Sequence, residues 1–131
     1  MTNPEIRYVS DAKSAPKAVG PYSQATICGN LAFLSGQVAL DPETMTLING
    51  GIEEQTEQVF NNIEAVLTHC GLTFKNVVRT TVYLKDMNNF TVMNSIYEKR
   101  MSGSRPARST IEVSRLPKDA MIEIDLIAML G

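Results

Sequence analysis

The sequence predicts a two-layer α+β domain, in which two helices cover one face of a β-sheet. Three observations favour this class. The predicted elements follow in the order strands, helix, strand, helix, strands; two segments show helical spacing of apolar residues; and several short segments alternate apolar with polar residues. With 131 residues, 44% of them hydrophobic and 20% charged, we expect one globular domain over residues 1–131.

The N-terminal part predicts short strands and one hairpin. Residues 6–9 form a first strand, and residues 11–20 form an irregular segment. Residues 25–28 and 31–35 flank Gly29-Asn30, a pair suited to a two-residue primed turn, and so predict a β-hairpin. Gly36 then ends or bulges the second strand, since a glycine inside a strand pattern often marks a bulge or a close approach to the backbone.

Two segments predict the helices, and a loop over residues 41–51 precedes the first. Residues 53–70 carry acidic residues at their start, Gly71 as a stop, and one apolar stripe made of Val59, Phe60, Ile63, Val66, Leu67 and Cys70. Residues 90–101 keep helical spacing and follow capping residues at 86–89. Both helices therefore have an apolar side that can pack on a sheet.

Strands on both sides of the second helix complete the sheet. Residues 77–85 alternate between apolar and polar side chains. Residues 109–114 and 121–130 predict two further strands, joined by a turn at residues 116–119, where Pro117 and Asp119 interrupt the pattern.

Alternation also assigns side chains to faces. In residues 121–130 an apolar set must face the core, which leaves Glu123 and Asp125 on the opposite side. We place Arg108, Thr110 and Glu112 on that same side, away from the core. The uncovered face would then combine these polar groups with Tyr83, Ile127 and Met129. Because that mixture is too apolar for a solvent-exposed surface and too charged for a core, we expect a homo-oligomer with sites between chains.

Arg108 and the acids have two interpretations. A guanidinium held on a strand suits a carboxylate or phosphate, and a nearby carboxylate can orient a water or move a proton. Alternatively, Arg108 forms an ordinary surface ion pair with Glu112 or Glu123. The basic residues near it are also ambiguous, because they can form an anion-binding rim or be solvated charge offset by the acids of the first helix: Lys99, Arg100, Arg105, Arg108, Arg115 and Lys118.

Composition and residue placement limit the partners, the cellular compartment and the metal sites that we expect. The net charge of −2 offers no general attraction for nucleic acid or an acidic membrane. Cys28 and Cys70 do not make a disulfide framework, and we expect both to be buried free thiols in a reducing compartment. No apolar segment resembles a signal peptide or a membrane span, so we expect a cytoplasmic protein. His69 and Cys70 diverge around a helix, which argues against a shared metal.

Several motifs, in order along nearly the whole chain, resemble the Rid (YjgF/RidA) family of enamine/imine deaminases. They are Gly20-Pro21-Tyr22-Ser23-Gln24-Ala25, Leu34-Ser35-Gly36-Gln37, Thr81-Val82-Tyr83-Leu84-Lys85-Asp86, Asn94 with Tyr97, Arg105-Pro106-Ala107-Arg108-Ser109, Leu116-Pro117 and Ile122-Glu123. The resemblance implies a chorismate-mutase-like fold with a mixed sheet, and homotrimers with pockets at the subunit interfaces. It also implies hydrolysis of enamines such as 2-aminoacrylate, through 2-imino acids, to 2-oxo acids and ammonia, without metal or organic cofactor. Pyridoxal-phosphate enzymes release such enamines.

The resemblance also implies site residues. Arg108 stands where the family binds the substrate carboxylate, and Glu123 where an acid orients the attacking water. The other positions expected to bind substrate are Tyr22, Ser35, Gly36, Asn94 and Thr110. Thr110 replaces a cysteine that many members carry, which removes support for thiol-based regulation. Each of these residues also has a plain structural interpretation: packing for Tyr22, a helix-face contact for Asn94, and a strand bulge for Ser35 with Gly36.

Two other functions remain open. Some relatives are described as translation inhibitors with ribonuclease activity, although the net negative charge argues against nucleic acid as a partner. A non-catalytic trimer that binds 2-oxo acids, or acts as a chaperone, is the other alternative.

Overall fold

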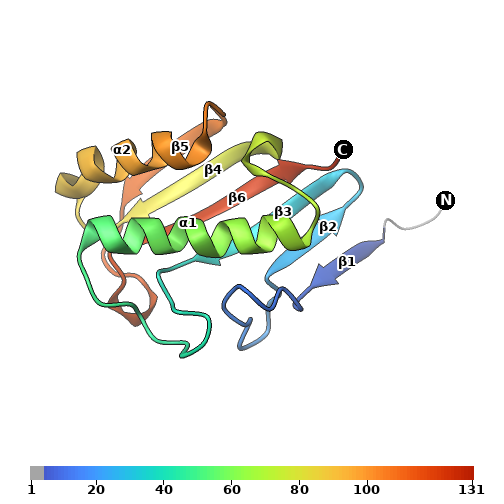
Figure 1. Cartoon of the computed structure of the whole chain (residues 1–131), viewed down its shortest axis with the longest axis horizontal. Coiled ribbons are helices and arrows are strands. Elements are labelled where there is room, and N and C mark those ends of the chain that lie inside the picture. Colours follow the sequence, from blue (N-terminus) through green and yellow to red (C-terminus); the bar gives the residue numbers. More distant parts are fainter. Residues whose placement is uncertain (1–4) are drawn as a thin grey trace.

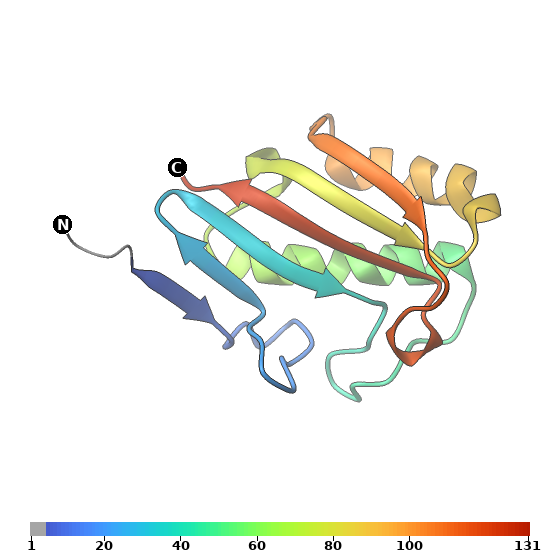
Figure 2. The same ribbon diagram turned by 180° about the vertical axis from the view of Figure 1, so that it is seen from behind.

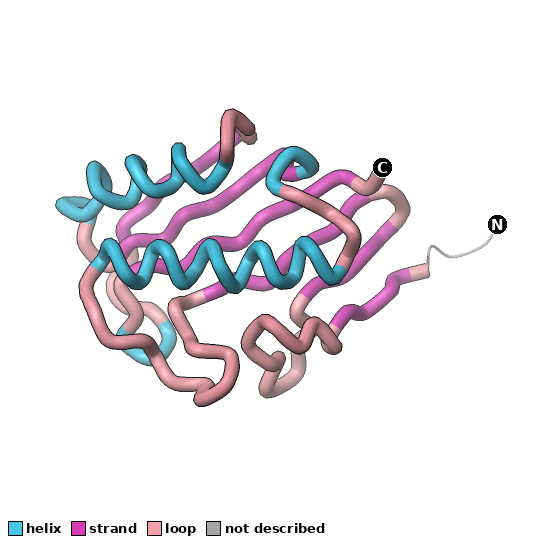
Figure 3. Tube along the Cα trace, in the orientation of Figure 1, coloured by secondary structure: helices cyan, strands magenta, loops and turns pink. Residues whose placement is uncertain are grey.

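The computed structural model describes residues 5–131, which form one six-stranded sheet with two helices on one of its faces (Figure 1). Figure 3 shows the same arrangement by type of element, and Figure 2 shows the sheet from its uncovered face. The elements are β1 (Ile6–Val9), β2 (Ala25–Cys28), β3 (Leu31–Gln37), α1 (Ile52–His69), β4 (Val77–Leu84), α2 (Phe90–Met101), β5 (Ala107–Glu112) and β6 (Ile122–Met129). The predicted fold class is therefore confirmed.

The strand order in the sheet is β1-β2-β3-β6-β4-β5. The hairpin of β2 and β3 is confirmed, with Gly29 at φ +61° in the left-handed conformation that glycine adopts without steric cost. A register shift between Leu34 and Gln37 bulges β3 at Gly36, as predicted. Among the strands of residues 5–131, the pairing of β4 with β5 is the only parallel one, so the sheet is mixed.

The last two strands are not neighbours, because β4 lies between β5 and β6. The turn between them is present as a 3-10 helix at Pro117–Asp119, but it carries the chain past the end of β4. Parallel strands need a crossover connection. The chain supplies it with α2, which leaves β4, crosses the covered face and returns as β5 at the edge (Figure 1).

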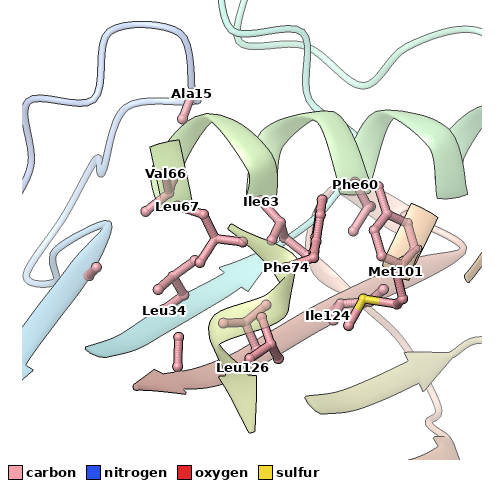
Figure 4. Close-up of a cluster of buried hydrophobic side chains, with 14 of the residues drawn as sticks. Ala15, Leu34, Phe60, Ile63, Val66, Leu67, Phe74, Met101, Ile124 and Leu126 are labelled. Carbon is pink, nitrogen blue, oxygen red and sulfur yellow. The ribbon is translucent and has the colours of Figure 1, made fainter. Parts of the chain in front are cut away.

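The core lies between the helices and the sheet. The apolar stripe of α1 meets side chains from β3 and β6, and Met101 joins it from α2 (Figure 4). Phe60 contributes two aromatic contacts, to Phe74 at 5.8 Å and to Tyr97 at 5.7 Å between ring centroids. Burying each such large apolar side chain stabilises the fold by roughly 1.5–3 kcal/mol. This rigid layer fixes the positions from which α2 and β6 present their polar groups.

The predicted helices and strands begin and end within one or two residues of the observed ones. Differences of this size are usual, because the ends of helices and strands are not sharply defined. Cys28 and Cys70 are free thiols, as expected, but both are only half-buried. Burial raises the pKa of the Cys70 thiol, and the charge of Arg7 opposes that rise in part. Neither helix in residues 5–131 is long and apolar enough to cross a membrane.

Candidate functional site

The pairing of β5 with β4 decides which face carries Arg108. Arg108 is the register partner of Thr80, and Thr110 is that of Val82; both β4 residues are buried beneath the helices. Paired residues share a face. Arg108, Thr110 and Glu112 therefore lie on the helix-covered face, and their predicted place on the uncovered face was wrong. The alternation of β5 predicts that the apolar Ile111 faces the core and that Arg108 faces away from it. Instead, Ile111 pairs with Tyr83 on the uncovered face of this edge strand and is 44% exposed.

Glu123 and Asp125 lie on the uncovered face, as predicted. Glu123 is the register partner of Tyr83 and Asp125 that of Thr81, whereas their β6 neighbours Ile122 and Ile124 are buried. The predicted site residues consequently separate into two groups on opposite faces of the sheet, one around Arg108 and one around Glu123.

The first group, the arginine half-site, consists of Arg108, Asn94, Tyr97 and Arg105. The Arg108 Nη1 donates a hydrogen bond of 2.7 Å to the Asn94 Oδ1. The guanidinium carbon lies 4.6 Å from the centre of the Tyr97 ring and 5.5 Å from that of Phe90. Tyr97 is itself fixed by a hydrogen bond of 2.8 Å between its hydroxyl and that of Thr80. Helix α2 thus supplies the groups that orient Arg108.

This arrangement leaves Arg108 able to bind an anion. Stacking on aromatic faces holds a guanidinium while leaving its N–H edges available. Among residues 5–131, the ion pairs are His69–Asp11, Arg100–Glu57 and Arg115–Asp119, none of which involves Arg108. The surface-pair interpretation of Arg108 is therefore wrong for this chain. Asn94, Tyr97, Arg105 and Arg108 line a cavity of about 570 Å³ that can admit a carboxylate.

The second group, the acid half-site, consists of Glu123, Gly36, Ser35 and Tyr22. These residues line a cavity of about 780 Å³, together with Lys118. A Cβ added at Gly36 would lie 2.8 Å from the Glu123 Cδ, closer than real Cβ contacts come. The absence of a side chain at Gly36 therefore makes room for the Glu123 carboxyl group on the bulge of β3.

Ser35 and its neighbours shape this cavity. The Ser35 Oγ donates to the Ser23 carbonyl, and its backbone N–H donates to the Gln24 carbonyl at 3.0 Å. Ser35 thus ties the segment that carries Tyr22 to β3. The Tyr22 side chain is exposed over the cavity, so it is accessible to a ligand or to another chain.

The acid half-site favours a protonatable carboxyl group. Partial burial of Glu123 and, secondarily, the negative charge of Asp125 raise its pKa above the ordinary value. The Tyr83 hydroxyl donates a hydrogen bond of 2.8 Å to the Asp125 Oδ2, and this bond is the main cause of a raised pKa of Tyr83. A carboxyl group with a raised pKa is a better proton acceptor than an ordinary carboxylate, and it can return the proton it has taken.

Glu112 and Thr110 line neither of these two cavities. Glu112 Oε1 accepts a hydrogen bond of 2.8 Å from the Met87 backbone N–H, so it stabilises the turn before α2. The Thr110 Oγ1 is buried and has no hydrogen-bond partner among residues 5–131. The basic stretch is partly neutralised, because Arg100 pairs with Glu57 of α1 and Arg115 with Asp119.

The sequence patterns did not predict the contact of Phe90 with Arg108, and they placed Lys118 in a basic stretch rather than at the cavity of Glu123. Phe90 begins α2 and lies under the Arg108 guanidinium, a contact that its helical spacing to Asn94 and Tyr97 could have suggested. Lys118 lies at the cavity of Glu123 with φ +58°. A non-glycine residue in the left-handed region costs of order 1–3 kcal/mol and is frequently found at functional sites. No pattern around Lys118 predicts that conformation.

Comparison with known proteins agrees with the fold and the motifs. The family model described as Endoribonuclease L-PSP matches residues 12–130. A RutC family protein of Pyrococcus horikoshii is 50% identical over 94% of this chain and 98% of its own, and the 2-iminobutanoate/2-iminopropanoate deaminase of Mus musculus is 44% identical over 96% and 93%. The crystal structure of the Rid family protein YyfA from Yersinia pestis superposes with a TM-score of 0.92 at 43% identity, covering 96% of this chain and 100% of that one. The chain therefore belongs to the Ribonuc_L-PSP (YjgF/Rid) family.

Proposed function

We propose that the chain hydrolyses reactive 2-imino acids, the tautomers of enamines such as 2-aminoacrylate, to 2-oxo acids and ammonia. The observation that carries the proposal is the chemical complementarity of the two half-sites. One presents a stacked guanidinium that pairs with no carboxylate in residues 5–131, and the other presents a carboxyl group with a raised pKa. An imino acid needs both groups, one for its carboxylate and one for water. The deaminase name of the mouse relative supports the same reaction.

The two half-sites cannot serve one substrate within a single chain, because the sheet lies between Arg108 and Glu123. The proposal therefore includes a composite site, with Arg108 from one copy and Glu123 from the next. The uncovered face supports such an assembly, since Phe33, Ile111 and Met129 remain 40%, 44% and 45% exposed there. Apolar side chains gathered on one face usually mark an interface. We expect a homotrimer with three such sites.

In the proposed reaction Arg108 binds the substrate carboxylate through charge-assisted hydrogen bonds. Glu123 accepts a proton from a water molecule while the water oxygen bonds to the imine carbon. Glu123 returns that proton to the nitrogen, which gives a neutral carbinolamine. Glu123 then takes the carbinolamine hydroxyl proton and delivers it to the amino nitrogen, so that the C=O bond forms as the C–N bond breaks and ammonia leaves. Water supplies the oxygen and the two hydrogens required, so no redox partner is needed. The site acts chiefly by positioning the substrate and moving these two protons in turn.

Mixing two inactive variants tests both the reaction and the composite site. 2-Imino acids would be generated in situ by an amino-acid oxidase or by threonine dehydratase, and their loss followed with wild type, Arg108→Ala and Glu123→Gln. Each variant alone should lose activity while remaining folded. After co-refolding, the Glu123→Gln chain supplies Arg108 and the Arg108→Ala chain supplies Glu123, so some sites should regain both groups. Recovery only in the mixture supports a shared site.

The outcomes also separate the alternatives. Wild type that binds 2-oxo acids but leaves the imine to decay at the uncatalysed rate would favour the binding or chaperone function. A ribonuclease function, which the family description names, would require salt-sensitive RNA binding that Lys118→Ala weakens. The pairing of Arg100 and Arg115 with acids reduces the basic surface available for it.

A further inference from the structure

The acid half-site contains a second carboxylate, Asp125, that the proposed reaction does not use. Asp125 follows Glu123 by two positions on β6, so both side chains project from the uncovered face, roughly 7 Å apart along the strand. Both are partly buried, where charges interact more strongly than in bulk water. Two neighbouring acids whose surroundings differ tend to divide into a permanent anion and a proton carrier.

The surroundings of these two acids do differ. Tyr83 is the register partner of Glu123, yet its hydroxyl reaches diagonally to the Asp125 Oδ2 at 2.8 Å. A donor bound to a carboxylate favours its ionised form. Glu123, by contrast, accepts no hydrogen bond from residues 5–131 and packs on the bare backbone of Gly36. The Asp125 carboxylate thus has a bound hydrogen-bond donor, whereas the Glu123 carboxyl group has none within residues 5–131.

Other charged groups around Glu123 do not offset this arrangement. Lys17 and Lys118 line the same cavity, with Tyr22, but neither lysine pairs with Glu123 or Asp125 in the described part of the chain. From β4, Arg79 lies further along and donates to Ser109 Oγ at 2.8 Å. The adjoining part of β3 contributes Ser35, Gly36 and Gln37 to the cavity, and none of these three side chains carries a charge. The pKa of Glu123 is raised by burial and, secondarily, by the charge of Asp125, which agrees with the absence of a paired cation within residues 5–131.

We propose that Asp125, held by Tyr83, is a fixed negative charge that makes Glu123 the proton carrier of the acid half-site. Asp125 is a positioning residue in this proposal: it acts on the protonation of Glu123 and touches no substrate. Use of that proton in imine hydrolysis rests on the proposed function, but the electrostatic relationship does not. In the proposed assembly Arg108 of a second copy also faces Glu123, and it is present in every variant considered below.

Carboxyl ¹³C NMR titration of the assembled protein tests the proposal without using activity. The Glu123 resonance is identified by its loss in Glu123→Gln. Asp125→Asn removes the charge but keeps a group that can accept from Tyr83, so the Glu123 titration midpoint should shift to lower pH. Asp125→Ser, which also lacks the charge, should shift it in the same direction. Tyr83→Phe keeps the charge and should move the midpoint less than either variant.

Glu64→Gln is the matched control, since it removes one negative charge from an exposed position on α1. A Glu123 midpoint that stays at the wild-type value in both Asp125 variants would overturn the proposal, and so would an equal shift in Glu64→Gln. A shift as large in Tyr83→Phe as in Asp125→Asn would assign the effect to the hydrogen bond and also contradict it.

Imine hydrolysis is measured on the same samples. The acidic limb of the kcat/KM profile should follow the NMR midpoint to lower pH in Asp125→Asn. If the midpoint moves but wild type hydrolyses no imine, the tuning by Asp125 stands and the proposed function fails. If wild type is active and the midpoint does not move, the deaminase proposal stands and the role of Asp125 is refuted.

Discussion

The backbone of Gly36 lies directly against the carboxyl group of Glu123. A Cβ at position 36 would contact the Glu123 Oε2 and lie 2.8 Å from its Cδ. Strands β3 and β6, which are distant in the sequence, therefore meet where Gly36 has no side chain, and the Glu123 side chain occupies that space.

Gly36→Ala should displace the Glu123 carboxyl group and reduce imine hydrolysis by about 100-fold, because a shift of about 1 Å in a catalytic group can cost that much. Steady-state kinetics with in situ imine generation measure the loss. Gly51→Ala is the control, since an added Cβ there would come no closer than 3.8 Å to the Glu54 Oε1. Wild-type kinetics in a folded Gly36→Ala protein would contradict this account of Gly36.

Arg108→Lys should raise KM roughly 10- to 100-fold, since lysine keeps the charge but loses the planar fork and the stacking on Tyr97. Asn94→Ala removes only the bond of 2.7 Å that orients Arg108, and should raise KM about fivefold. The inhibition constant of a 2-oxo acid measures carboxylate affinity without turnover. It should rise more in Arg108→Lys than in Asn94→Ala. Equal effects of both substitutions on the inhibition constant would contradict the view that Asn94 only orients Arg108.

Thr110→Val should leave the free energy of unfolding unchanged or raise it by about 1 kcal/mol, because it replaces a buried hydroxyl that lacks a partner. Thr56→Val is the matched control and should destabilise the fold, since the Thr56 Oγ1 donates to the Ile52 carbonyl at 2.7 Å. Denaturant unfolding measures both. A clear loss of stability in Thr110→Val would show that the hydroxyl is bonded. The KM of this variant tests whether Thr110 also contacts substrate.

Glu123→Gln should be more stable than wild type at neutral pH, and the difference should shrink in acid. Burial raises the pKa of Glu123 in the folded state above its ordinary value of 4.5. The folded protein therefore holds this proton more tightly than the unfolded chain, so wild type loses stability as pH rises from about 4.5 through the folded pKa. Because Glu123 is partly exposed, solvent reduces the effect. Thermal unfolding from pH 4 to 8 checks it; a constant difference in Tm across that range would contradict the assignment.

Local patterns were sufficient for most of the fold. The stripe from Val59 to Leu67 identified α1, the Gly29-Asn30 pair identified the hairpin, and the apolar face of Ile122, Ile124 and Leu126 identified β6. These features depend on neighbouring residues only. The motifs around Arg108 and Glu123 likewise led to the family, and the comparisons confirm that membership.

Such local patterns did not predict the order of the strands in the sheet or the face of the sheet on which the β5 side chains lie. β5 carries polar or half-exposed side chains on both sides, so its alternation defined two sets of residues without showing which set faces the helices. That choice depends on its parallel pairing with β4, which follows from the path of α2 across the sheet.

By itself, the sequence determined the class of fold and the family, and it named candidate residues for anion binding and proton transfer, because these follow from side-chain chemistry, motifs and local periodicity. Only the tertiary structure decided that Arg108 and Glu123 lie on opposite faces, that Gly36 makes room for Glu123, and that Tyr83 bonds Asp125 rather than Glu123. Each of those relationships joins residues on different strands, and strand pairing is a long-range choice made by the packing of the whole domain.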